Sequence, residues 1–198
     1  MGSTLDPAAF LSLARTLSLR PSSSSADLVG LRRATSTAYY AVFHQILRHG
    51  CLQLVAGASE GDIANVSRWF THSGVFKAAT WVMLAVGGRP PRLADRAAVQ
   101  LLRGRREAAV GIPDELASLA QTFAQLQSAR HQADYSNAYE PVRFTTQQDV
   151  EAAGLAVASA RLLWEGRDSE DAERRAASEA HGRFLLLCLT ASGGPRSR

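Results

Sequence analysis

The sequence predicts an all-α protein, an antiparallel up-and-down bundle of five to six helices. Apolar residues recur at intervals of three and four along most of the chain, and this spacing places them on one face of an α-helix. No segment shows the sustained alternation of apolar and polar residues, bounded by turn residues, that a β-strand needs. Short loops rich in glycine, proline and serine separate the periodic segments, which favours antiparallel neighbours.

The first two helices are defined by their caps. The first runs from residue 7 to about residue 19, because Asp6 is a good N-cap and Pro7 suits the first helical position. The second is long and begins at Ser25 or Asp27. It is expected to end near residues 48–50, where Gly50 can act as a C-terminal stop. Its apolar face contains Leu31, Ala34, Ala38, Val42 and Ile46.

The middle of the chain predicts a third helical region and a short helix. The third region begins near Asp62, is interrupted or kinked by THSG at 71–74, and resumes over 75–86. Two glycines and two prolines then end it. The stretch 93–104 allows one short helix.

The last third of the chain predicts a fourth and a fifth helix and a C-terminal extension. The fourth starts at Pro113 and Asp114, and its apolar face contains Leu116, Leu119, Phe123 and Leu126. The fifth has a capping box, Thr145 with Gln148 or Thr146 with Asp149, and runs to about Trp164. We expect two parts: a bundle over 1–167 with an Arg-rich insert near 87–111, and a C-terminal helix with a disordered tail over 168–198.

Composition favours a cytoplasmic protein without metal or membrane. No apolar run approaches the ~20 residues that span a bilayer, and residues 1–16 lack the pattern of a secretory signal. The two cysteines, Cys51 and Cys188, have no metal-type spacing and are expected to be unrelated reduced thiols. We expect no cofactor.

Positive charge is concentrated in the Arg-rich insert. The net charge is +4, and the six arginines between residues 89 and 107, set against Asp95 and Glu107, carry a charge of that size by themselves. Such a segment is either a solvated loop or a contact for a polyanion, whose affinity would then fall steeply with salt.

A polar line runs beside the apolar face of the second helix. It consists of Arg33, Thr37, Tyr40 and His44, at helical spacing. The apolar face of the fourth helix continues into Arg130 and Asp134. We therefore expect a polar cluster shared by these two helices. It is either a functional site or a buried network that fixes helix register.

Two motifs of this region resemble those of the HEPN superfamily. They are RRATSTAYYAVFH at 32–44 and RHQADY at 130–135, and the resemblance covers residues 25 to 165. It implies a dimeric helical bundle of prokaryotic toxin–antitoxin or defence systems. Many members are metal-independent endoribonucleases with an Arg, four to six residues and then a His. In these the imidazole transfers a proton and the Arg stabilises charge on the phosphate.

This sequence departs from that signature. The positions where the His is expected hold Tyr135, Ser136 and Asn137. The catalytic candidates are therefore Arg130 with His131 or His44. The residues expected to bind RNA or a nucleotide are Arg33, Tyr40, Asp134 and Tyr135, with Arg130 and Arg33 on the phosphate and Asp134 orienting one of them.

Three functions follow from the resemblance. The first is a homodimer that binds RNA or a nucleotide, with catalysis left open by the altered signature. The second is an active metal-independent endoribonuclease with a displaced His. The third is a non-catalytic partner of a nucleotidyltransferase-type antitoxin. One other match to the Arg–His spacing, Arg174 or Arg175 with His181, lies beyond the resembling region.

Overall fold

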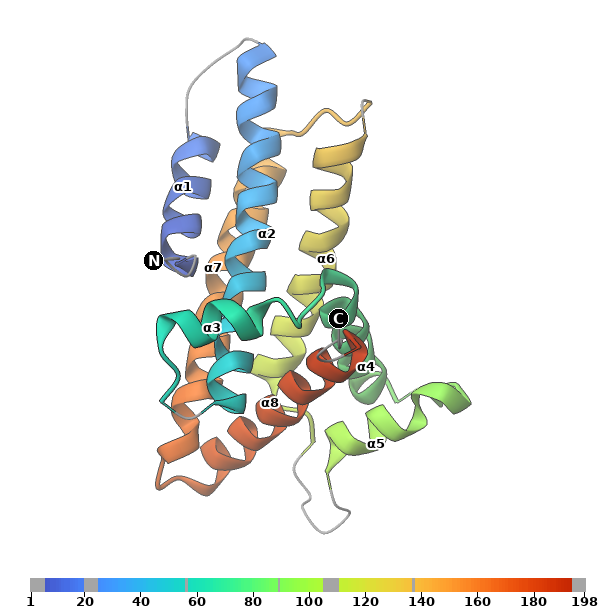
Figure 1. The fold of residues 1–198 in the computed structure, drawn as a ribbon. Coiled ribbons are helices and arrows are strands. Elements are labelled where there is room, and N and C mark those ends of the chain that lie inside the picture. Colours follow the sequence, from blue (N-terminus) through green and yellow to red (C-terminus); the bar gives the residue numbers. More distant parts are fainter. Residues whose placement is uncertain are drawn as a thin grey trace.

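The computed structural model describes residues 6–19, 25–55, 57–88, 90–104, 111–136 and 138–193. Within these ranges the protein is all-α, as predicted, and contains no strand (Figure 1). Eight α-helices occur there instead of five or six, because the third region forms two helices and the short helix forms as well. The helices are α1 (Pro7–Leu19), α2 (Ser25–Leu54), α3 (Glu60–Ser67), α4 (His72–Val86), α5 (Arg96–Arg103), α6 (Asp114–Tyr135), α7 (Arg143–Glu165) and α8 (Ala172–Ala191).

The centre of the bundle consists of α1, α2, α6 and α7. Helix α2 packs against the other three, and α6 packs against α7. Figure 1 shows these helices lying lengthwise beside one another, with α8 crossing obliquely near the C-terminal end of α2. Helix α8 packs mainly on α4, and α5 covers α4 and α8. The apolar side of α8 belongs to the same core and contains Phe184, Leu185, Leu187 and Cys188.

The predicted apolar faces of α2 and α6 are confirmed. Every residue named for them is buried: Leu31, Ala34, Ala38, Val42 and Ile46 of α2, and Leu116, Leu119, Phe123 and Leu126 of α6. Tyr39 and Phe43, two of the three tyrosine and phenylalanine residues of the first motif, also belong to the core. The two helices therefore meet along a continuous apolar seam, which sets where the residues beyond it lie.

The predicted end of α2 at Gly50 is wrong. The helix continues to Leu54, and Gly50 lies inside it. A Cβ added at Gly50 would stand 2.5 Å from Cζ of Phe70. The glycine is thus explained by the close approach of the Phe70 ring and does not stop the helix.

The segment THSG does not kink one continuous helix but starts a new one. Thr71 is the N-cap of α4, and its hydroxyl accepts a hydrogen bond from the N–H of Gly74 at 3.0 Å. The Thr71 N–H in turn donates to Oγ of Ser192, at the end of α8, at 2.9 Å. The first turn of α4 is therefore fixed against α8.

The predicted capping boxes of the fifth helix are wrong. Helix α7 begins at Arg143, before both of them, and has no side-chain hydrogen bond at its N-cap. Arg143 itself anchors this end. Its Nη2 donates to both carboxylate oxygens of Asp27, at 2.7 and 2.6 Å, and its Nη1 donates to the carbonyl of Ser18 at 2.8 Å. One arginine thus joins α1, α2 and α7.

Three further expectations concern the whole chain. No helix in the described ranges is long and apolar enough to cross a membrane. Cys51 and Cys188 are free, buried thiols. The tail expected to be disordered falls from residue 194 onward outside the described residues, as do Arg89, Arg105 and Arg106 of the Arg-rich insert.

Candidate functional site

The two motifs meet where the N-terminal half of α2 lies against the C-terminal end of α6. The apolar face of α6 packs on α2 up to Leu126, which is 1% exposed. Residues three and four further on occupy the same face of a helix, so Arg130 and Asp134 also face α2. Periodicity alone therefore positions these two polar residues against the polar line of α2.

Asp134 connects the two helices. Its Oδ1 accepts a hydrogen bond from Oγ of Ser36 at 2.6 Å, and its Oδ2 forms an ion pair with Nε of Arg130 at 2.7 Å. Arg130 Nη2 donates to the hydroxyl of Tyr40 at 3.1 Å. A continuous chain, Ser36–Asp134–Arg130–Tyr40, thus links α2 to α6. Ser36 was not expected from the sequence, although it lies one helical turn from Tyr40.

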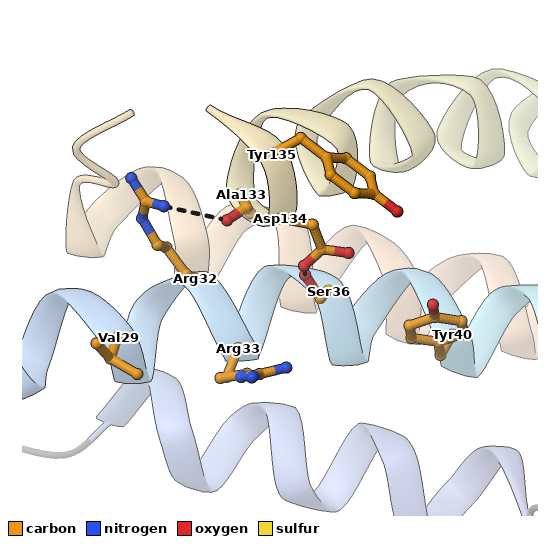
Figure 2. Close-up of a pocket in the computed structure, with 8 residues that line it drawn as sticks. All are labelled: Val29, Arg32, Arg33, Ser36, Tyr40, Ala133, Asp134 and Tyr135. Atoms are coloured by element: carbon orange, nitrogen blue, oxygen red, sulfur yellow. Dashed lines mark hydrogen bonds between the residues drawn. The ribbon is translucent and has the colours of Figure 1, made fainter. Parts of the chain in front are cut away.

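A pocket of about 450 Å³ opens beside this chain. Figure 2 shows that its lining comes from the N-terminal half of α2 and the last turn of α6. The lining residues are Val29, Arg32, Arg33, Ser36, Tyr40, Ala133, Asp134 and Tyr135. The structure thus brings together all four residues expected to bind RNA or a nucleotide.

The two adjacent arginines of α2 have different roles. Arg32 Nη2 donates to the carbonyls of Ser136 and Tyr139, at 2.8 and 2.5 Å, and so holds the segment that follows α6. Arg33 is exposed and makes no hydrogen bond or ion pair with any described residue. Figure 2 shows its side chain in the pocket, directed along α2 towards Tyr40. Arg33 is therefore a cation available to a ligand.

Arg130 is held among aromatic rings. Its Cζ lies 5.8 Å from the ring centroid of Tyr39, 5.6 Å from that of Tyr40 and 5.4 Å from that of Tyr135. Burial by itself would lower the pKa of Arg130, but Tyr40, Asp134 and the other two tyrosines together raise it. Cation–π contacts of this kind favour a charged, fixed guanidinium. Arg130 is thus oriented before any ligand arrives.

His44, the first histidine candidate, lies near the cluster but is covered on one face. Its ring stacks on that of Phe10 of α1, with centroids 5.2 Å apart and planes 5° apart. It makes no hydrogen bond with a described residue. Burial, and then the neighbouring His72, lower the pKa of His44, so its imidazole is neutral at pH 7.

His131, the second candidate, is not part of the cluster. It is exposed, and its one ring contact among the described residues is with Tyr135, at 5.1 Å between centroids. It follows Arg130 directly, and successive residues of a helix point about 100° apart. Its side chain therefore leaves the helix in a different direction from that of Arg130.

His72 is the residue that sequence reasoning missed. The sequence predicts only an interruption or kink at THSG, whereas His72 is half-buried as the first residue of α4. Its Nδ1 lies 2.6 Å from the hydroxyl of Tyr39, and its ring stacks on Phe43 at 4.0 Å between centroids. Burial and the charge of Arg130 lower the pKa of His72. A threonine N-cap directly before it was the local signal that α4 starts there.

The Arg-rich insert lies away from this site. Its described arginines are Arg92, Arg96 and Arg103, on or next to α5. Helix α5 packs on α4 and α8, and Figure 1 shows it near the opposite end of the molecule from the N-terminus of α2. Arg103 donates to the carbonyl of Ala85 at 3.1 Å. The insert and the pocket are therefore separate surfaces.

The described part of the chain supports neither a site formed by His181 with Arg174 or Arg175 nor a metal centre. His181 is 1% exposed, inside the core, whereas Arg174 and Arg175 are exposed. The described residues contain no group of three or more His, Cys, Asp or Glu that could hold a metal ion.

No family model, no curated protein and no solved structure matches this chain. Its function therefore has to follow from the geometry of the pocket.

Proposed function

We propose that this protein binds RNA or a nucleotide through phosphate, as a HEPN-like helical homodimer of a toxin–antitoxin or defence system. One observation carries the proposal: both motifs contribute to one pocket. It is lined by Arg33, which makes no hydrogen bond or ion pair with a described residue, and by Asp134 and Tyr40, the two residues that hold Arg130. Guanidinium groups match phosphate oxygens with paired hydrogen bonds.

The dimensions and chemistry of the pocket suit this ligand class. Its volume of about 450 Å³ lies in the range of small-ligand sites, roughly 300–1,000 Å³. Arg130 uses Nε and Nη2 on protein groups, while its Nη1 makes no hydrogen bond with a described residue. Tyr135 is 64% exposed at the rim, where an aromatic ring can stack on an unpaired base. The ion pair with Asp134 holds Arg130 in place, and the negative charge of Asp134 offsets part of the positive charge that Arg130 presents to a ligand.

Removing either arginine is expected to weaken RNA binding. Arg33→Ala and Arg130→Ala should each lower the affinity for a fluorescent single-stranded RNA about tenfold at low salt. Each should also reduce the slope of log K against log salt by about one, because each removes one phosphate contact. Fluorescence anisotropy across a salt series, with excess chelator, measures both quantities.

Arg68→Ala is the matched control for this experiment. Arg68 is an exposed arginine at the end of α3, outside the pocket lining. Its replacement changes the net charge by the same amount and should leave affinity and salt slope nearly unchanged. If all three variants bind alike, general surface charge explains RNA binding and the pocket does not.

A metal-independent endoribonuclease is the second candidate function, because two neutral imidazoles, His44 and His72, contact the ring of Tyr40, to which Arg130 donates a hydrogen bond. Such a ring can take a proton from the 2′-hydroxyl while a guanidinium stabilises charge on the phosphate. Burial lowers the pKa of both rings. The charge of His72 lowers the pKa of His44 further, and the charge of Arg130 lowers that of His72.

Cleavage without metal tests this second candidate. Wild-type protein should cut total RNA in the presence of chelator, and Arg130→Ala should slow the reaction by about 100-fold or more. His44→Ala should slow it by at least tenfold, whereas His131→Ala should not change it. An uncut substrate with wild type, or equal rates in wild type and Arg130→Ala, removes the nuclease and leaves the binding function standing.

A further inference from the structure

The pair formed by Tyr39 and His72 determines which ring nitrogen of His72 carries the proton. Tyr39 is 0% exposed, and burial raises the pKa of its phenol well above the ordinary value. The hydroxyl is therefore always protonated near neutral pH. Among the described residues its one hydrogen-bond partner is Nδ1 of His72, at 2.6 Å.

A buried hydroxyl proton without an acceptor is costly. Tyr39 therefore donates to Nδ1, which must carry a lone pair. In a neutral imidazole with an unprotonated Nδ1 the proton lies on Nε2. Burial and the charge of Arg130 lower the pKa of His72, and this keeps the ring in that neutral form at pH 7.

The ring of His72 is also fixed in direction. It stacks on Phe43 with centroids 4.0 Å apart and planes 27° apart. It contacts the rings of Tyr39 and Tyr40, at 5.6 and 5.9 Å. Arg130 lies against the same two rings, at 5.8 and 5.6 Å. His72 and Arg130 thus flank one pair of tyrosines, from α4 and from α6.

The Nε2–H of His72 is a donor without a protein partner. It makes no hydrogen bond with any described residue, and the ring is half-buried rather than enclosed in the core. Tyr39, Tyr40, His44 and Arg130 are the titratable groups that interact with it, and no carboxylate is among them. A fixed donor in electropositive surroundings suits a negatively charged oxygen.

We infer that His72 is a second phosphate contact of this site, donating from Nε2 to the group that Arg130 binds, and that Tyr39 is the positioning residue that fixes its tautomer. The inference rests on the proposed function and adds a residue outside both motifs. In this proposal His72, from α4, takes the place of the histidine that this sequence lacks after Arg130. The shared ligand chemistry is phosphate, in an RNA chain or in a free nucleotide.

Three substitutions at two positions test the inference. His72→Ala should weaken RNA binding about tenfold, as expected for one lost hydrogen bond to a charged group. His72→Gln keeps an N–H donor close to the position of Nε2 and should stay within threefold of wild type. Tyr39→Phe leaves the ring but frees the tautomer, so it should bind with intermediate affinity. Parallel titrations with a short RNA and with a mononucleotide identify the source of the phosphate.

NMR of the wild-type protein keeps the inference testable if a variant fails to fold. Nitrogen-15 spectra should show Nδ1 of His72 unprotonated and Nε2 protonated, and added ligand should shift the Nε2 resonance. The opposite tautomer, or an Nε2 resonance that ligand leaves unchanged, overturns the inference. If His72→Ala binds like wild type while Arg130→Ala does not, the inference fails and the proposed function stands. If Arg130→Ala also binds like wild type, the proposed function fails.

Discussion

Lowering the pH from 7 to 5 is expected to reduce the free energy of unfolding by about 2–3 kcal/mol. Most of the effect comes from two core histidines, His49 of α2 and His181 of α8, which are 4% and 1% exposed. Burial also lowers the pKa values of His44 and His72, so these two rings act in the same direction. The rings of His49 and His181 meet edge to face, with centroids 5.5 Å apart. Neither of these core rings has a carboxylate partner among the described residues, so protonation would place an uncompensated charge in the core.

Burial is the main cause of both low pKa values. It lowers the pKa of His49 to about 3, with His181, Arg161, Arg48 and Arg167 as further positive neighbours. It lowers the pKa of His181 to about 4. In the unfolded chain both groups titrate near 6.5. Below pH 6.5 the unfolded chain therefore takes up protons that the folded protein excludes, so stability is complete above 6.5 and is lost as the pH falls towards 4.

The size of the loss follows from the same values. Each histidine costs about 1.4 kcal/mol per pH unit in this window, hence about 4 kcal/mol for both at pH 5. Asp149 acts in the opposite direction, because burial raises the pKa of its carboxyl to about 6. A raised carboxyl pKa adds stability on acidification, here about 1.4 kcal/mol at pH 5. The histidines therefore dominate.

Urea unfolding at pH 7 and pH 5 measures this loss. His181→Leu removes one of the two groups and should shrink the difference between the two pH values by about 2 kcal/mol, whatever it does to stability at pH 7. His131→Gln replaces an exposed histidine and should leave the difference unchanged. A wild-type protein equally stable at both pH values would contradict the assignment of these two rings as neutral core residues.

The fold could be predicted where local spacing decides it. The stripe from Leu31 to Ile46 and that from Leu116 to Leu126 are both buried, because a helical period of about 3.6 leaves little choice of face. Gly50 shows where this reasoning stops. Its role depends on Phe70, which reaches it from beyond α3. Contacts of this kind have no local signal.

The candidate site divides in the same way. Arg130 and Asp134 continue an apolar stripe, so their direction towards α2 could be predicted from the sequence. The contact of His72 with Tyr39 depends on where α4 lies, and α4 packs mainly on α8 and α6. His44 and His131 are the histidines that lie inside the two motifs. The structure instead puts His72 against the tyrosines that flank Arg130.

Gly74→Ala is expected to destabilise the protein by about 2–3 kcal/mol, the cost of overpacking a tight contact. A Cβ at Gly74 would stand 2.7 Å from N and 2.8 Å from Cα of Ser192, and closer still to its Oγ. Because backbone atoms are involved, no side-chain rotation relieves the clash. Alanine gains about 1 kcal/mol in helix propensity over glycine, so the observed loss is what remains after that gain.

Gly61→Ala is the matched control, since Gly61 is also in the first turn of a helix. Its nearest neighbour to an added Cβ is Oγ of Ser59, at 3.7 Å. This variant should be as stable as wild type or more stable by up to about 1 kcal/mol. Thermal unfolding of the two variants side by side separates the clash from the effect of alanine itself.

Gly74→Ala should also disturb the candidate site around His72, because Gly74 lies two residues after His72 in the first turn of α4. If α4 moves away from α8 to accommodate the new methyl group, the 2.6 Å contact between His72 and Tyr39 cannot stay as it is. The Nδ1 resonance of His72 should then shift in Gly74→Ala and not in Gly61→Ala. An unfolding temperature and a His72 resonance equal to those of the control would show that the contact with Ser192 does not position α4. The site histidine would then owe its place to the stack on Phe43 instead.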